Sequence, residues 1–291
     1  MSAVAKWLAG NRIRRVVIIA GLFPLPLLGL VSAATVVMAA SLRGPRETIL
    51  DCLAALILLI GLGALTGMDL KMLGLSAALS WAVWVALGTL AGRTGSLTLT
   101  VQAGVLIALI GLLGFLAAVG DPVAYWHPIL EAWYADLASQ GLDLQADLEQ
   151  QASMMSGALL AFTLGGSLFA LMLGLSWSWS ISGRTLGESF RQLQLGYVIG
   201  LLAAAAGVLA LVGMSLNGAL LIFGVAFAYQ GAAVLAWWAR KMNWPRRWWL
   251  VLVIVPLVFL GVLALELALL SALGFVDNWF SLRKGDSRPA D

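Results

Sequence analysis

Long apolar runs constrain this chain more than any other feature of its sequence. About eight hydrophobic segments fall at residues 16–42, 49–66, 72–91, 98–119, 157–177, 195–213, 216–239 and 248–274. An α-helix needs roughly 20 residues to cross the ~30 Å hydrocarbon core of a bilayer, and most segments are close to that length. The strands of an outer-membrane barrel would alternate apolar and polar residues, and no such alternation occurs. We therefore expect an all-α fold, a polytopic integral membrane bundle of helices.

The composition excludes several classes of function. The chain is 62% hydrophobic and 11% charged, whereas soluble domains are about 25% charged. Its single cysteine, Cys52, and single histidine, His127, cannot form a disulfide framework or a multi-histidine metal site within one chain. Phosphate-binding loops, dinucleotide-binding turns and the common hydrolase motifs are absent from the sequence. We expect no enzyme activity, no cofactor, no metal site and no binding of nucleic acid.

Basic residues indicate how the segments are oriented in the bilayer. Nine of them lie in alternate connections, and the opposite set of connections holds only Lys71. The nine are Arg43, Arg46, Arg93, Arg184, Arg191, Arg240, Lys241, Arg246 and Arg247. Because cytoplasmic loops carry the excess of Lys and Arg, we place these connections inside.

The first segment allows two interpretations. If residues 16–42 crossed once, the basic stretch 12–15 would lie on the outer side, against the positive-inside rule. Pro24 and Pro26 favour a break, because proline removes helical hydrogen bonds. A broken or re-entrant hairpin would keep both ends inside, and we favour an inside N-terminus. The side of the polar C-terminal tail, 277–291, stays open.

One connection is long enough to hold structure of its own within the single transmembrane domain that we expect over residues 1–291. Residues 120–156 are acidic and would form an extracytoplasmic loop. Ile129, Trp133 and Leu137 recur every four residues after Pro128, which predicts an amphipathic helix with Pro128 at its start. That helix is either a lid over an outward-facing site or a surface helix with a solvated acidic face.

Four residues inside the spans are candidates for binding a ligand. Glu266 is the one carboxylate in an apolar run, where a charge costs roughly 2.5–3.5 kcal/mol, so it should face the bundle, be paired or be protonated. Gln230 and Gln102 either line a pocket or hold helices together, at about 0.6 kcal/mol each. Trp81 lies deep enough in its span either to stack on an aromatic ligand or to pack in the core.

The most basic loop is a candidate docking surface. Arg240, Lys241, Arg246 and Arg247 could bind anionic headgroups or a cytoplasmic partner. Orientation in the membrane also accounts for them, because cytoplasmic loops are basic in general.

Several motifs resemble those of the YybS-like family of uncharacterised bacterial membrane proteins. They are Gly92-Arg93-Thr94-Gly95-Ser96-Leu97, Gly120-Asp121-Pro122 with Trp126, Met154-Met155-Ser156-Gly157, Ser189-Phe190-Arg191-Gln192-Leu193-Gln194, and Gly274-Phe275-Val276-Asp277 with Arg283. These motifs are distributed between Gly92 and Arg283. That family is grouped by fold with the substrate-binding subunits of energy-coupling-factor vitamin transporters.

The resemblance implies a multi-pass protein of the bacterial cytoplasmic (inner) membrane with a pocket open to the outside. It also implies a coupling protein and ATPase subunits as partners, besides the lipid bilayer. The chain departs from those subunits in having about eight hydrophobic segments where they typically have six. Their small-x-x-x-small docking pattern on the first helix is represented here only by Thr35 and Ala39.

Two functions of different classes follow as hypotheses. The first is a transport-related binding protein that captures an unidentified small molecule from the outer face. Glu266, Gln230, Gln102 and Trp81 would line or support its site. The alternative is a membrane scaffold or assembly factor for envelope processes, which docks a partner through the basic loop 240–247.

Overall fold

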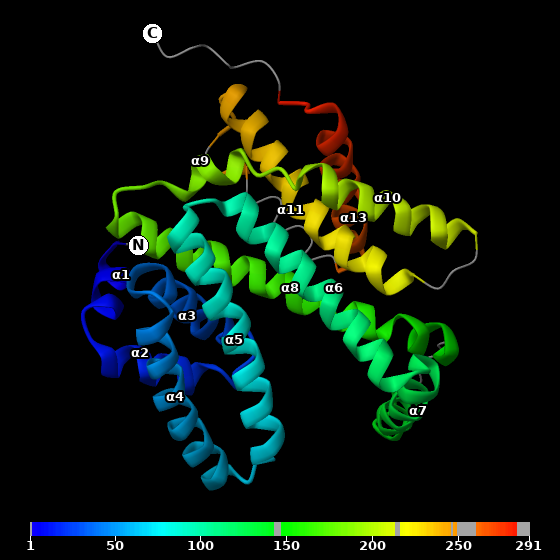
Figure 1. The fold of residues 1–291 in the computed structure, drawn as a ribbon. Coiled ribbons are helices and arrows are strands. Elements are labelled where there is room, and N and C mark those ends of the chain that lie inside the picture. The colour runs from blue at the N-terminus through cyan, green and yellow to red at the C-terminus, as the bar shows by residue number, and fades with distance from the viewer. Residues whose placement is uncertain (1, 143–146, 213–215, 246, 249–259, 284–291) are drawn as a thin grey trace. The chain divides into compact units, whose positions relative to one another are not determined.

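The described part of the chain is entirely helical. The computed structural model describes residues 2–142, 147–212, 216–245, 247–248 and 260–283, and no strand occurs among them. Its helices are α1 Ser2–Ala9, α2 Arg12–Leu22, α3 Gly29–Arg43, α4 Pro45–Thr66, α5 Leu70–Thr94, α6 Leu97–Val119, α7 Pro122–Ser139, α8 Leu148–Ile181, α9 Leu186–Arg191, α10 Gly196–Leu211, α11 Asn217–Lys241 and α13 Leu260–Phe280 (Figure 1). The all-α fold predicted from the sequence is confirmed.

Six described helices are long and apolar enough to cross a membrane. They are α4, α5, α6, α8, Gly218–Lys241 of α11 and Val262–Phe280 of α13. Two further apolar helices, α3 and α10, are shorter, with 15 and 16 residues. The predicted segment 248–274 overlaps α13 only in part, because residues 249–259 lie outside the described chain. Six candidate spans therefore support a multi-pass membrane protein. They do not confirm the predicted count of about eight segments.

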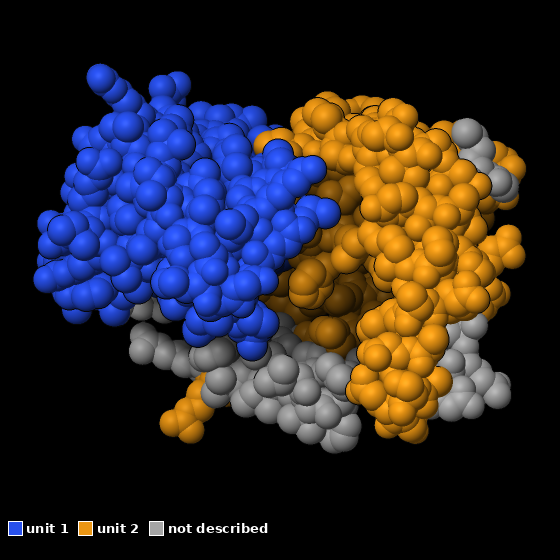
Figure 2. Space-filling view, turned by 90° about the horizontal axis from the view of Figure 1, so that it is seen from below, with its two compact units in different colours: residues 1–104, 166–192 blue, residues 105–165, 193–291 orange. Residues whose placement is uncertain are grey.

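Packing divides the chain into two compact units. Unit 1 comprises residues 1–104 and 166–192, and unit 2 comprises residues 105–165 and 193–291 (Figure 2). Helices α6 and α8 each contribute one part to either unit. The division does not test the single domain predicted for residues 1–291.

The first apolar segment of unit 1 forms a hairpin. Helix α2 ends at Leu22 and α3 begins at Gly29, so Pro24 and Pro26 lie in the break, as the sequence predicts. Arg15 Nη1 and Arg43 Nη2 both donate to the carbonyl oxygen of Ala9, at 3.2 and 2.6 Å. The two ends of the segment therefore meet, and whether the hairpin re-enters the membrane stays a prediction.

Helix α3 is the centre of unit 1. All nine residues from Ser32 to Ala40 are buried. They include Thr35 and Ala39, so this small-residue pair does not form an exposed docking surface. Glycines of α5 allow the close approach to α3, because a Cβ on Gly88 would lie 2.7 Å from the carbonyl oxygen of Val37.

We expect Gly88→Leu to destabilise unit 1, because its side chain would meet the backbone of α3. Overpacking of this kind costs about 1–3 kcal/mol. Gly61→Leu is the matched control, since nothing lies within 4 Å of a Cβ built on Gly61. Thermal unfolding of both variants in the same detergent would measure the difference. Equal melting temperatures would contradict the packing described here.

The amphipathic helix predicted in the outer loop begins earlier than expected. Helix α7 starts at Pro122, after Asp121, whose side chain accepts hydrogen bonds from the backbone N–H groups of Val123 and Ala124. Pro128, predicted at the first helical position, lies inside α7 instead. The cap at Asp121 with proline at the next position is a strong helix start, and it outweighs the one hydrogen bond lost at Pro128.

Unit 2 is built on the contact of α11 with α13. A Cβ on Gly231 would collide with the backbone of Leu270, and one on Gly274 would collide with the carbonyl oxygen of Phe227. The absence of side chains at these two positions lets the helix backbones touch, as small residues do between membrane helices.

Candidate functional site

The four residues predicted to bind a ligand are divided between the units. Trp81 and Gln102 belong to unit 1, and Gln230 and Glu266 belong to unit 2. Each unit is therefore considered by itself. Gln102 is partly exposed on α6, whereas Trp81 and Gln230 are buried.

Gln230 is part of a buried polar network in unit 2. Its Oε1 accepts from the backbone N–H of Leu195 at 2.8 Å, and its Nε2 donates to Asp277 Oδ2 at 2.8 Å. Arg283 donates to both oxygens of Asp277, at 3.2 and 2.6 Å, and to the carbonyl oxygen of Leu193 at 2.8 Å. Both ends of the Gln230 amide are thus engaged, and the residue ties α11 to α13 and to the start of α10.

The same network places Arg283 at one end of unit 2. Leu193 follows the connection that holds Arg184 and Arg191, which the positive-inside rule assigns to the cytoplasm. Because Arg283 bonds the carbonyl of Leu193, it lies at the same end of unit 2 as the start of α10, and the side of the membrane that this end faces stays a prediction. The remainder of the predicted tail, residues 284–291, lies outside the described chain.

Glu266 lies on a largely exposed stretch of α13. It is half-buried, and the residues on either side of it, Leu265 and Leu267, are 60% and 42% exposed. No described residue forms a hydrogen bond or an ion pair with its carboxylate. The structure therefore gives Glu266 no polar pocket among the described residues, and its role in binding stays a prediction.

The predicted docking loop is exposed where it is described. Arg240, Lys241 and Arg247 are exposed, and Arg246 lies outside the described chain. Lys241 Nζ lies 4.7 Å from the ring centroid of Trp237, in a cation–π contact. A lysine beside a tryptophan at a helix end is typical of a membrane interface.

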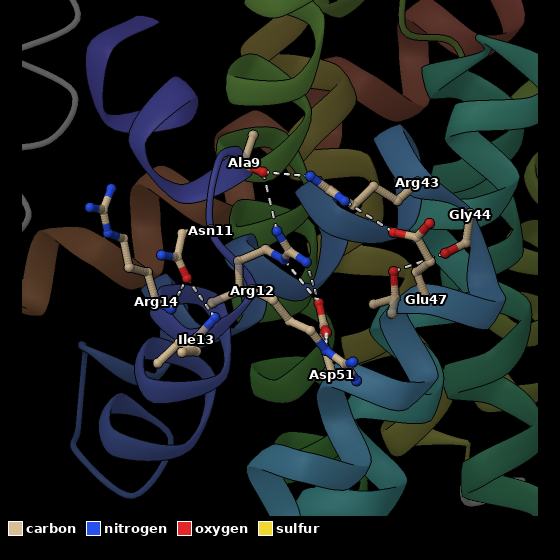
Figure 3. Close-up of polar contacts among 11 residues, drawn as sticks. Ala9, Asn11, Arg12, Ile13, Arg14, Arg43, Gly44, Glu47 and Asp51 are labelled. Carbon is tan, nitrogen blue, oxygen red and sulfur yellow. Dashed lines mark hydrogen bonds and ion pairs between the residues drawn. The ribbon is translucent and has the colours of Figure 1, made fainter.

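An ion cluster closes the N-terminal hairpin against α4 (Figure 3). Arg12 Nε lies 2.7 Å from Asp51 Oδ1, and Arg15 Nη2 lies 2.8 Å from Oδ2. Arg43 pairs with Glu47 at 3.1 Å. The partners of Asp51 come from α2, because the hairpin returns the start of that helix to the same end of the unit.

A cavity of about 200 Å³ lies beside this cluster. Its lining is Gly10, Arg12, Arg15, Arg43, Glu47, Leu50 and Asp51. The guanidinium groups of this lining are already engaged by Asp51, by Glu47 and by the carbonyl of Ala9 at the end of α1. We interpret the cluster as a lock between helices.

Unit 1 has a groove between α4 and α5, with a volume of about 540 Å³. Its lining from α4 is Pro45, Ile49, Cys52, Leu53 and Leu56, and its lining from α5 is Ala78, Trp81, Ala82, Val85, Ala86, Thr89, Leu90 and Arg93. The walls are almost wholly apolar. One charged side chain, Arg93, stands at the end of the groove.

Two residues that line this groove carry a buried polar atom without a partner. Trp81 Nε1 and Thr89 Oγ1 are the only buried side-chain nitrogen or oxygen atoms in the described chain without a hydrogen bond. Trp81 is 2% exposed, and its ring packs edge-to-face on Phe23 at 5.4 Å. An unsatisfied buried polar group costs about 1–3 kcal/mol.

Of the predicted ligand residues, only Trp81 lines this groove. The spacing in the sequence could have identified further lining residues on α5. Val85, Thr89 and Arg93 follow Trp81 at intervals of four residues, so all four share one face of a helix. That Thr89 would lack its usual bond to a backbone carbonyl, and that α4 would leave room beside the stripe, follow only from packing.

Comparisons with known proteins found no relative of this chain. No protein-family model, no curated protein and no solved structure matches the chain. The resemblance to the YybS-like family therefore stays a prediction.

Proposed function

We propose that this protein is a membrane-embedded binding protein for a small hydrophobic molecule, and that the α4/α5 groove is its site. The proposal depends on one observation: two residues with an unpartnered buried polar atom, Trp81 and Thr89, both line the same apolar groove. Ligand sites are mostly apolar concavities of about 300–1,000 Å³ with a few polar groups that fix orientation. The groove has that size and that chemistry.

The groove lies toward the ends of α4 and α5 that we expect to face the cytoplasm. Pro45 and Arg93 line one end of it, and Arg93 belongs to the connections assigned to the cytoplasm. We therefore propose that the ligand exchanges with the inner half of the bilayer. Capture from the outer face beneath loop 120–156 has no support in this groove and stays a prediction.

Blocking the groove tests the proposal. Ala82 lines the groove and is exposed, so Ala82→Phe should fill the space without disturbing the core. We expect this variant to lose saturable binding of tritiated oleyl alcohol by the detergent-purified protein. Ala64→Phe is the matched control, because Ala64 is exposed on α4 outside the groove. Unchanged binding by Ala82→Phe, or absence of saturable binding by the unaltered protein, would overturn the proposed site.

A transport role is a further part of the proposal. A binding protein of this kind would act with a coupling protein and ATPase subunits, and purification of the tagged chain in mild detergent would retain them. Recovery of envelope proteins without ATPase subunits would favour the scaffold hypothesis instead.

A further inference from the structure

We propose that the small cavity beside the N-terminal ion cluster binds the phosphate group of an anionic phospholipid. The cavity of about 200 Å³ lies between the start of α2, the end of α3 and the first turns of α4. It is smaller than the roughly 300–1,000 Å³ of sites that enclose a whole small molecule, so only a headgroup would enter it. The site is separate from the α4/α5 groove and does not depend on the proposed function.

The ion cluster uses only part of the Arg12 guanidinium. Arg12 contacts Asp51 through Nε, at 2.7 Å, and its two terminal nitrogens form no hydrogen bond with a described residue (Figure 3). The Arg12 side chain lines the cavity and is 58% exposed, so a ligand can reach it. A guanidinium presents paired donors that match the oxygens of a phosphate, and charge-assisted hydrogen bonds of this kind are strong.

The balance of charge around the cavity favours an anion. Its lining holds three arginines and two carboxylates, which leaves one positive charge in excess. Arg46, in the first turn of α4, is exposed and has no ion pair with a described residue. Residues 1–46 contain six lysines and arginines and no acidic residue. A negatively charged ligand would therefore be attracted to this end of unit 1.

An exposed apolar face of α4 continues from the cavity and indicates a lipid. Leu50 lines the cavity and is 47% exposed, and Ile57, two turns further along the same face, is 75% exposed. Acyl chains attached to a phosphate at Arg12 would lie along this face. We expect the connection 43–46 to face the cytoplasm, where basic pockets between membrane helices bind anionic headgroups. A phospholipid fits both the basic cavity and the apolar face, whereas a free phosphate uses the cavity alone.

Lipid titration of the whole protein in detergent tests the inference. Native mass spectrometry would compare dioleoylphosphatidylglycerol with dioleoylphosphatidylcholine, which have the same chains and a phosphate but differ in net charge. We expect phosphatidylglycerol to bind about fivefold more tightly, the factor that one basic residue near the membrane surface provides. Equal affinities for the two lipids would overturn the proposal.

Arg12→Gln assigns the preference to the cavity. We expect this variant to bind phosphatidylglycerol about fivefold more weakly and phosphatidylcholine as before. Arg14→Gln is the matched control, because Arg14 is an exposed arginine of the same helix that does not line the cavity. Its guanidinium lies over the ring of Trp7 instead, 4.7 Å from the centroid. Equal losses from the two variants would show a general attraction to basic residues and would overturn the site.

Leu50→Glu tests the cavity without removing a member of the ion cluster. The new carboxylate would repel a phosphate, so we expect the affinity for phosphatidylglycerol to fall about fivefold or more. Leu65→Glu is its control, because Leu65 is 86% exposed at the other end of α4. Since Leu50 forms no part of the ion pairs, this variant tests the site even where Arg12→Gln disturbs the fold. Unchanged binding by Leu50→Glu would overturn the cavity as the site.

Two further measurements separate the lipid from other ligands and from the groove. Millimolar inorganic phosphate should leave phosphatidylglycerol bound, because free phosphate lacks the contact of acyl chains with α4. Displacement of the lipid would assign the cavity to a soluble phosphate compound and overturn the choice of a lipid. Ala82→Phe, which blocks the α4/α5 groove, should not change phosphatidylglycerol binding. Loss of lipid binding by that variant would place the lipid in the groove and overturn the cavity site.

Discussion

Replacing Asp51 by asparagine is expected to lower the free energy of unfolding by about 3–5 kcal/mol. Arg15 is 2% exposed and faces Asp51 with two nitrogens, Nε at 2.9 Å and Nη2 at 2.8 Å. Without the carboxylate its charge would be buried and uncompensated. The lost ion pair with Arg12 would contribute less to this change, because the Arg12 side chain is 58% exposed and can turn to solvent. An SDS titration of the purified protein would measure the loss.

Two variants make the Asp51 prediction specific. Glu47→Gln lies on the same helix and breaks the pair with Arg43, but both side chains are exposed, so we expect at most about 1 kcal/mol. Replacing the buried pair together, by Asp51→Leu with Arg15→Met, should recover much of the stability, because the one charge left unpaired, on Arg12, is exposed to solvent. If Asp51→Asn cost no more than Glu47→Gln, the interpretation of the cluster as a lock would be wrong.

Asp277→Asn should have an effect of similar size in unit 2, about 3 kcal/mol. Asp277 is fully buried and accepts hydrogen bonds from Arg283 and from Gln230. An asparagine would present an amide N–H₂ group to donors that now meet an oxygen. Arg283, whose side chain is 12% exposed, would also lose its counter-charge. Unfolding should be monitored in the same detergent as for Asp51→Asn.

Glu266→Gln is the matched control on the same helix. It makes the same change from acid to amide, but Glu266 is half-buried and has no hydrogen bond or ion pair with a described residue. We expect little or no loss of stability from it. A loss equal to that of Asp277→Asn would show that Glu266 has a partner of its own. That outcome would support Glu266 as a candidate for binding a ligand.

The two networks have a common geometry. Each joins a helix end to a carboxylate on another helix, Asp51 with the start of α2 and Asp277 with the start of α10 through Gln230. Between membrane helices the hydrophobic effect does little to select partners, because lipid tails are as apolar as the side chains. Buried charges with one good partner therefore fix which helices meet, and their removal should loosen the packing of each unit.

The sequence by itself determined the helices. Runs of about 20 apolar residues can satisfy backbone hydrogen bonds in lipid only as helices or closed barrels, and the missing alternation left helices. Pro24 and Pro26 marked the break before α3 for the same local reason, the loss of a donor within the helix. Prediction failed locally at the start of α7, where the cap at Asp121 outweighed Pro128.

Only the tertiary structure decided which side chains meet. Spacing places Trp81, Thr89 and Arg93 on one face of α5, but it does not say that α4 leaves a groove beside that face. The sequence likewise does not say which cation pairs with Asp51. Only the fold shows that α2 returns to supply Arg15. Helical periodicity is local, whereas burial and pairing depend on residues as far apart in the chain as Gln230 and Asp277. That separation is the physical reason why the fold class could be predicted from the sequence and the groove could not.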